Sequence, residues 1–167
     1  GSVQVEKDWM REREKAFRFV VSSKPALVLF DPERVLLCER TENKTTADLF
    51  QQYRLAANVR DRLEALQLLV DEEPAGITEE LISALEDSFW GIRLFALDYL
   101  ELEALPLDQI IAIAKNDPHS HVRAAACFFL GQAGNTQYVG DLETIIENDF
   151  SLLTTATALD ALYSLAP

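Results

Sequence analysis

Residue types that commonly carry chemistry are scarce in this chain of 167 residues, which has two cysteines, two histidines, one methionine and six glycines. Cys38 and Cys127 lie far apart, each in an apolar stretch, so we expect two buried free thiols rather than a disulfide framework. The sequence lacks a Gly-x-Ser-x-Gly elbow, a glycine-rich phosphate loop and a Cys-x-x-Cys pair. We therefore assign no catalytic and no cofactor-binding residue.

Long apolar runs and positive charge are also lacking. No run approaches the ~20 residues that a membrane span needs, and no signal peptide opens the chain. The chain has 15 basic and 28 acidic residues, which gives a net charge of −13. Because a polyanion repels phosphate groups, nucleic acids and membrane surfaces are excluded as partners. A hydrophobic content of 49% instead predicts a soluble, acidic, globular protein.

The charge is divided unevenly along the chain. Residues 3–44, with the leading Gly1-Ser2, hold nine basic and eight acidic residues, a net charge of +1, whereas residues 45–167 carry −14. The polar stretch 41–44 is the expected joint between the two parts. Gly1-Ser2 is typical of a cloning scar, so the true start is expected to be missing and the localisation stays unknown.

The first part, residues 3–44, has the pattern of strands. In residues 15–21 (KAFRFVV) large apolar side chains recur with a period of two. Residues 25–30 (PALVLF) form an apolar run that ends at the turn signal Asp31-Pro32, and residues 35–38 (VLLC) resume it. Residues 3–10 fit a strand or a helix. We expect a small antiparallel β segment that forms part of a β-sandwich.

The second part, residues 45–167, has a helical apolar period and eight expected helices. Thr45 or Thr46, Asn58, Ser88 and Ser120 are the expected N-caps of four of them. The third helix should begin at Thr78. The other seven helices are expected at residues 45–56, 58–70, 88–102, 106–116, 120–132, 137–147 and 151–165.

The second member of each helical pair repeats the sequence Ala-x-x-x-Leu at a period near 31. The repeated alanines are Ala65, Ala96, Ala126 and Ala158. A small residue lets two helices approach closely, and the leucine four residues later fills the space between layers. This periodicity predicts a mainly α fold, an α-α superhelix of about four helical hairpins.

A more specific pattern lies inside the repeat. DSFWGIR runs from Asp87 to Arg93, and DPHSHVR runs from Asp117 to Arg123. This resembles the HEAT-repeat signature, in which a loop Asp and a helix Arg are associated with stacking between hairpins. The outer repeats depart from the signature: Arg62 has Ala56 in place of the Asp, and Thr155 replaces the Arg that should follow Asp149. Terminal repeats are often atypical because one side lacks a neighbour.

Other clusters have ordinary structural interpretations. His119 and His121 could supply two metal ligands, but a polar helix start explains them better and no metal ligand is assigned. The aromatic residues fall at helical spacing, which favours packing between layers over a ligand box; they are Phe89, Trp90, Phe95, Tyr99, Phe128 and Phe129. The acidic runs favour a solvated face over a site for a basic partner; they are residues 71–73, 79–80 and Glu101 with Glu103.

The order of the two parts resembles the carboxyl-terminal region of the M1 (gluzincin) zinc aminopeptidases. In that family a small β-sandwich ends in a Lys-Pro-x-x-Val-x-(Phe/Ile)-Asp-Pro segment, and a HEAT/armadillo-like helical domain follows. Residues 24–37 (KPALVLFDPERVLL) match the segment, and Arg62, Ala65 and Leu69 begin the helical pattern. The family's His-Glu-x-x-His and Gly-x-Met-Glu-Asn motifs do not occur in this sequence.

The resemblance implies a non-catalytic scaffold or lid, whose helical array covers the active-site cleft of a peptidase. The implied partners are the catalytic domain of the same polypeptide, which holds the zinc, and the peptide substrate. A truncated sheet would also leave a β edge at which two copies could pair. The alternatives are a free-standing HEAT-like protein interaction module and, with less support, an independent HEAT-like lyase.

Overall fold

The computed structural model describes residues 4–9, 11–104 and 106–165, and within them the regular structure is helical. The mainly α fold is thus confirmed. The helices are α1 (Thr46–Leu55), α2 (Val59–Glu72), α3 (Ile77–Ala84), α4 (Trp90–Tyr99), α5 (Leu107–Asn116), α6 (Ser120–Gln132), α7 (Val139–Asn148) and α8 (Leu152–Leu165), with short 3-10 turns at Leu102–Ala104 and Thr136–Tyr138.

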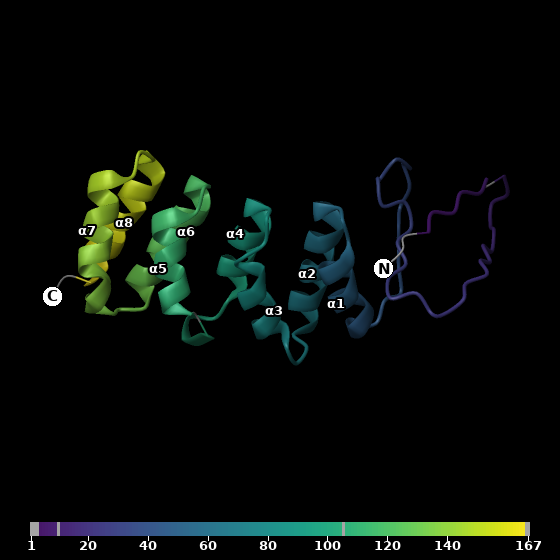
Figure 1. Cartoon of the computed structure of the whole chain (residues 1–167), viewed down its shortest axis with the longest axis horizontal. Helices are drawn as coiled ribbons and strands as arrows, with labels where there is room; N and C mark the ends of the chain where they lie inside the picture. Colours follow the sequence, from purple (N-terminus) through teal and green to yellow (C-terminus); the bar gives the residue numbers. More distant parts are fainter. Residues whose placement is uncertain (1–3, 10, 105, 166–167) are drawn as a thin grey trace.

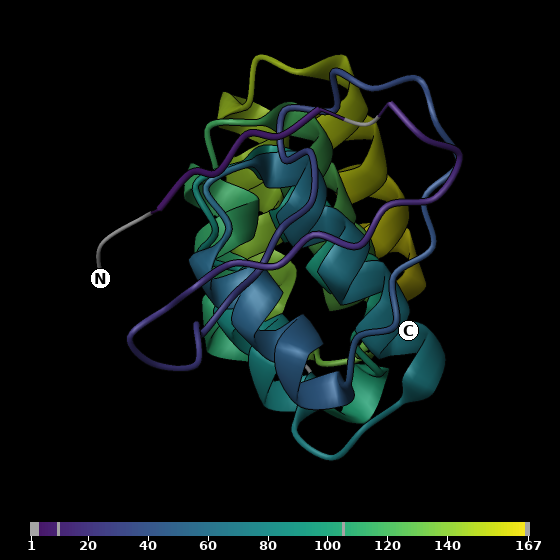
Figure 2. The same cartoon turned by 90° about the vertical axis from the view of Figure 1, so that its right-hand side faces the viewer.

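Consecutive helices pack as antiparallel pairs, and the pairs follow one another along the long axis of the molecule (Figure 1). Seen from the amino-terminal end, the helices lie behind one another (Figure 2). Contacts between α4 and α6 and between α6 and α8 join neighbouring pairs. A superhelical twist of this row stays a prediction.

Local signals explain where several helices begin. Thr45 caps α1 as expected, since its hydroxyl accepts a hydrogen bond from the Asp48 amide while the Asp48 carboxylate accepts one from the Thr45 amide. Asn58 caps α2 through the Arg60 amide. Helix α3 begins at Ile77 rather than Thr78, because Gly76 adopts the left-handed backbone (φ 91°) that turns the chain into the helix.

The core runs through the row of helices and is built from the repeated positions. All four predicted alanines (Ala65, Ala96, Ala126 and Ala158) are completely buried. Gly131 of α6 shows how tightly neighbouring pairs pack, because a Cβ placed there would lie 2.8 Å from the Cα of Ala161 in α8. Small residues at these positions therefore set the spacing between layers.

The expected antiparallel β segment is not supported. None of the described residues before Thr45 lies in a strand, and the one main-chain hydrogen bond among these described residues joins the Arg34 amide to the Asp31 carbonyl. The period of two is still expressed locally, since the rings of Phe17 and Phe19 stack with centroids 6.5 Å apart. An extended segment becomes a strand only when a second segment pairs with its main chain, and no described segment of this chain does so. Val3, Met10 and the predicted scar lie outside the described residues.

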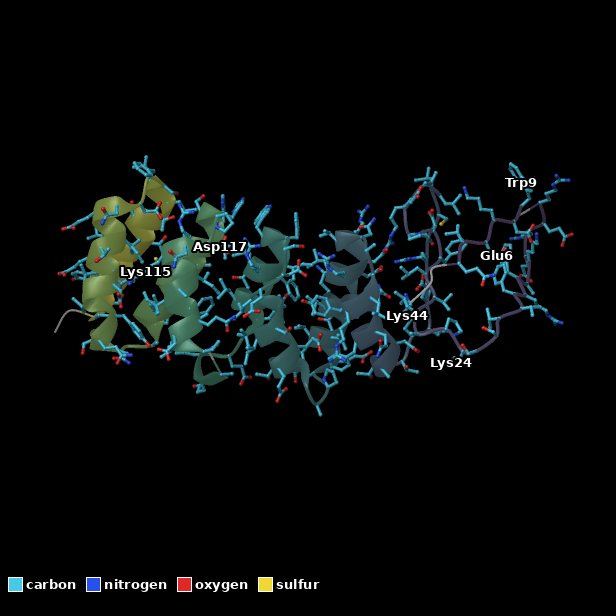
Figure 3. All side chains as sticks on the ribbon, viewed as in Figure 1. Glu6, Trp9, Lys24, Lys44, Lys115 and Asp117 are labelled. Atoms are coloured by element: carbon cyan, nitrogen blue, oxygen red, sulfur yellow. The ribbon has the colours of Figure 1, made fainter. Side chains whose placement is uncertain are left out.

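This amino-terminal arm, residues 4–44, extends beyond the first helical pair (Figure 1). Trp9 and Glu6 lie well away from the helices, whereas Lys44 lies beside them (Figure 3). Most large apolar side chains of the arm face solvent, and Val20 is 96% exposed. Cys38 is also exposed, so the expectation that both thiols are buried holds only for Cys127. Cys38 lies in a stretch that faces solvent, since residues 35–37 next to it are exposed as well.

None of the described helices combines the length and the apolar character that a bilayer span requires.

Candidate functional site

The Arg and Asp residues of the repeat signature form a ladder of ion pairs between successive helical pairs. Nε and Nη2 of Arg93 donate to Oδ2 and Oδ1 of Asp117 at 2.6 and 2.7 Å. Arg123 and Asp149 repeat this geometry at 2.6 and 2.8 Å. Each guanidinium also donates through Nη1 to the carbonyl of the Asp in its own pair, Asp87 or Asp117. Two-point pairing of this kind fixes both distance and orientation.

The same carboxylates start the following helices. Asp87 accepts a hydrogen bond from the Phe89 amide at 2.8 Å, and Asp117 accepts one from the His119 amide at the same distance. Ser88 and Ser120, the predicted N-caps, do not have this role: the N-cap residues are Phe89 and His119. An ionised carboxylate is a stronger hydrogen-bond acceptor than a serine hydroxyl and is favoured near the positive end of a helix.

The first rung of the ladder is weaker than the others. Arg62 contacts Asp87 through Nη2 alone, at 2.9 Å, and its buried Nε has no hydrogen-bond partner in the described structure. Ala56 stands where the later pairs have an Asp, as the sequence indicated. The terminal pair is therefore atypical in its geometry as well as in its sequence.

A second set of ion pairs joins the other helices of the row. Arg54 of α1 pairs with the buried Glu80 of α3, and Lys115 of α5 lies 2.5 Å from Asp141 of α7. Five of the six basic residues after residue 45 thus bind an acid 24–26 positions later, in the next helical pair. Glu80, expected on a solvated face, is instead part of this framework, while Glu79 is exposed.

The electrostatics of the ladder favour the charged forms. The hydrogen bond to Asp117 raises the pKa of Arg93, and that to Asp149 raises the pKa of Arg123. The Arg123 guanidinium lowers the pKa of Asp149 in return, against the opposing effect of burial. These shifts favour the charged forms of Arg93, Arg123 and Asp149.

The carboxyl-terminal section of the arm, residues 31–44, docks on the first helical pair through charge. Arg34 donates to the completely buried Asp61 and to Glu64, both at 2.7 Å. Arg40 also binds Glu64, and the Asn58 side chain donates to the Pro32 carbonyl at 3.1 Å. Burial alone would raise the pKa of Glu64, but hydrogen bonds from the two guanidinium groups lower it.

Asp61 occupies a position that is apolar in the next two pairs. Its counterparts in the 31-residue repeat are Ile92, Val122 and Thr154, all completely buried. The buried Gln52 beside it donates to the Asp61 carbonyl at 2.8 Å and accepts from Lys44 of the arm. The outer face of the first pair is thus polar where basic side chains of the arm (Arg34, Arg40 and Lys44), rather than another helical pair, contact it. Sequence reasoning missed Asp61 and Gln52, although a lone acid at an aliphatic position was a visible signal.

An open groove of about 790 Å³ lies between the first and second pairs. Arg54, Arg62, Glu80 and Asp87 are among its lining residues. Tyr53 also lines it, and burial, followed by the charges of Asp87 and Glu80, raises the pKa of this phenol to about 12. The tyrosine is therefore neutral at physiological pH, and the ionic groups of the wall already pair with one another.

The two histidines take part in an aromatic cluster. The His119 ring stacks on the Trp90 indole with centroids 3.9 Å apart, and His121 lies 6.1 Å from the same ring. In the described part of the chain, no group of three or more His, Cys, Asp or Glu side chains is arranged to hold a metal ion. Packing explains part of the aromatic set, since Phe89, Phe95 and Phe129 lie against the core. The other three aromatic residues (Trp90, Tyr99 and Phe128) are substantially exposed.

No family model matches the chain, and no curated protein matches it.

Proposed function

We propose that the chain is the carboxyl-terminal, non-catalytic scaffold of an M1-family zinc aminopeptidase. Its four HEAT-like pairs cover the active-site cleft of a catalytic domain that belongs to the same polypeptide. The scaffold restricts access to peptides that fit under it and excludes bulk water from the cleft. The zinc and the catalytic residues belong to that domain, and no residue of this chain is assigned to them.

The observation that carries the proposal is the unpaired arm. Residues 15–37 contain the segment that resembles the end of the family's β-sandwich; their main chain is in no described strand, and most of their large apolar side chains are exposed. Extended apolar segments of this kind acquire main-chain and side-chain partners when they join a sheet. A sandwich supplied by preceding polypeptide would cover these residues.

The ladder of ion pairs supports the second half of the proposal. A lid must keep its shape while substrate enters beneath it, and the two-point pairs between Arg93 and Asp117 and between Arg123 and Asp149 hold three helical pairs in fixed relation. Rigid positioning, rather than chemistry, is what this arrangement supplies.

The decisive test is to read the gene upstream of Val3. A His-Glu-x-x-His motif with a downstream glutamate in the same reading frame is expected. The product of that complete frame should then release amino-terminal residues from peptides in a zinc-dependent manner. An upstream sequence without the motif would refute the proposal and favour the free-standing interaction module.

The acidic surface provides a second test on the complete protein. A charge of −14 in residues 45–167 should draw the positive amino terminus of a substrate toward the cleft, and salt should weaken this effect. Neutralising Asp71, Glu72, Glu73 and Glu79 should flatten the salt dependence of kcat/KM; Glu80 is left intact because it pairs with Arg54. The matched control neutralises four other exposed acids: Asp108, Glu143, Glu147 and Asp160. Equal slopes in wild type and the first variant would refute steering by that surface.

A further inference from the structure

Helix α4 carries a carboxyl group in the middle of its exposed, largely apolar face. Asp98 follows Leu94 by four residues and Phe95 by three, so the three side chains lie together on one side of the helix. The Tyr99 ring lies beside them, with its centroid 4.4 Å from that of Phe95, and Tyr99 is 51% exposed. The exposed face of α4 is thus apolar and aromatic around a single acid.

Asp98 lacks the counterion that the acids of the ladder have. None of the ion pairs between described residues includes it, and the only basic residue of α4, Arg93, pairs with Asp117. Although Asp98 is exposed, the protein around its carboxyl group excludes enough water to raise its pKa. A carboxylate that has lost part of its hydration without gaining a counterion is destabilised, and a bound cation would offset that cost.

The apolar surface continues onto α6, which packs beside α4. Phe128 holds the position equivalent to Asp98 in the next helical pair, 30 residues later, and is 49% exposed. Arg123, which pairs with Asp149, is the only lysine or arginine of α6, and α8 has none. The exposed faces of α4, α6 and α8 therefore offer aromatic rings and acids but no free lysine or arginine.

We propose that a basic peptide segment of another protein binds this aromatic-acidic face, which consists of Leu94, Phe95, Asp98, Tyr99 and Phe128. An arginine or lysine of the segment lies over Asp98 and against the Tyr99 ring, and an adjoining apolar side chain contacts Phe128. Aromatic rings attract cations through their faces, and the carboxylate supplies the neutralising charge.

Charge and dimensions both favour this occupant. Residues 45–167 carry −14, which repels an acidic segment and draws a basic one. Packed neighbouring helices lie ~10 Å apart, so a ligand that contacts both Asp98 on α4 and Phe128 on α6 spans about three extended residues. A small cation reaches only one of these two side chains, whereas a peptide segment reaches both.

Fluorescence anisotropy of the full chain with a synthetic probe tests the proposal. The probe is the amidated peptide Gly-Leu-Arg-Phe-Arg-Leu with an uncharged fluorophore. In a matched probe, citrulline replaces both arginines, which removes the charge and keeps the shape. The arginine probe should bind with a dissociation constant on the order of 100 µM, and the citrulline probe roughly fivefold more weakly or worse. Equal affinity for the two probes would overturn the proposal.

Two variants with the same change of charge locate the site. Asp98→Asn should weaken binding of the arginine probe about tenfold, whereas Asp108→Asn, at an exposed acid of α5, should change it by less than about twofold. Phe128→Ala should weaken binding about threefold through the lost apolar contact. Circular dichroism checks that each variant is folded. Equal losses in Asp98→Asn and Asp108→Asn would show attraction by the overall negative charge and would refute this site.

A second copy of this chain is the competing occupant, because residues 15–19 (KAFRF) of the arm are themselves basic and aromatic. Sedimentation equilibrium separates the two cases. The chain should sediment as a monomer of 18.8 kDa, and a dimer that Asp98→Asn dissociates would overturn the proposed partner in favour of self-association. The face belongs to the helical row alone, so these results are independent of whether an aminopeptidase domain precedes the arm.

Discussion

The guanidinium of Arg93 in α4 and the carboxylate of Asp117 before α6 form a two-point ion pair in which both side chains are more than nine-tenths buried. The pair joins two helical pairs, and Asp117 also accepts a hydrogen bond from the amide of His119, the N-cap residue of α6. One contact thus stabilises both the layer spacing and a helix start. Its removal should cost more than the loss of a surface ion pair.

We predict that Arg93→Met destabilises the protein by about 3 kcal/mol, because Asp117 would remain buried without its counterion. Lys115→Met is the matched control: its partner Asp141 is one third exposed, and the loss should stay below about 1 kcal/mol. Urea denaturation followed by circular dichroism measures both. Equal losses in the two variants would contradict a special role for the ladder.

The ladder was largely predictable, since the Asp and Arg of the repeat recur at fixed spacing and the helical period is strong from residue 45 onward. What the spacing did not reveal is that Asp87 and Asp117 also accept hydrogen bonds from the amides of Phe89 and His119, the N-cap residues of α4 and α6. A single carboxylate can bind an arginine of the preceding helical pair and also a main-chain amide at the start of a helix. Local N-cap preferences, in contrast, point only to the nearest residue with a hydroxyl group.

The arm was predicted less well, for a physical reason. Alternation in residues 15–21 reports side-chain preference, but a strand also needs a second main chain to bind, and that requirement is not written in the segment itself. The docking of Arg34 on Asp61 was equally hidden, because 27 residues separate them and only the fold brings them together.

Close packing between α6 and α8 gives a prediction about two glycines. Gly131→Ala should destabilise by about 1–3 kcal/mol, since the new Cβ would lie 2.8 Å from Ala161 and the layers must separate. Gly140→Ala in α7 meets no atom within 4 Å and should be neutral or stabilise by up to about 1 kcal/mol through helix propensity. Thermal unfolding distinguishes them, and a stabilising Gly131→Ala would show that the layers are not in contact there.

The ion pair of Asp149 gives a prediction about acid. Because Arg123 lowers the pKa of Asp149 below its value in the unfolded chain, the pair stabilises the fold above about pH 4 and loses this effect as pH falls through the lowered pKa. Asp149→Asn should therefore be less stable than wild type at pH 7, and the difference should shrink toward pH 3. The pKa of Asp98 is shifted in the opposite direction, because burial of its carboxyl group raises it. Asp98→Asn should not destabilise at pH 7, and a pH-independent deficit in Asp149→Asn would refute the linkage.

Docking of the arm on the first pair can be measured with a double-mutant cycle. Arg34→Leu alone should cost about 2–4 kcal/mol, because it leaves the completely buried Asp61 without its counterion. Combining it with Asp61→Leu restores the aliphatic character that Ile92 and Val122 have at this position, so the double variant should regain most of the loss. Strictly additive losses would show that the two side chains do not interact in solution.

The two thiols should differ in reactivity. Cys38 is exposed, whereas burial raises the pKa of Cys127 to about 12, so its thiolate is absent at pH 8. A thiol reagent at pH 8 should modify one cysteine in the folded protein and two in denaturant, and Cys38→Ser should abolish the native reaction. The raised pKa also means that unfolding becomes easier from about pH 8.5 upward, because the unfolded thiol ionises there and the folded one does not. Cys127→Ala should reduce this alkaline loss of stability. Rapid modification of Cys127 in the folded Cys38→Ser protein would show that α6 opens far more readily than its packing against α5 and α8 implies.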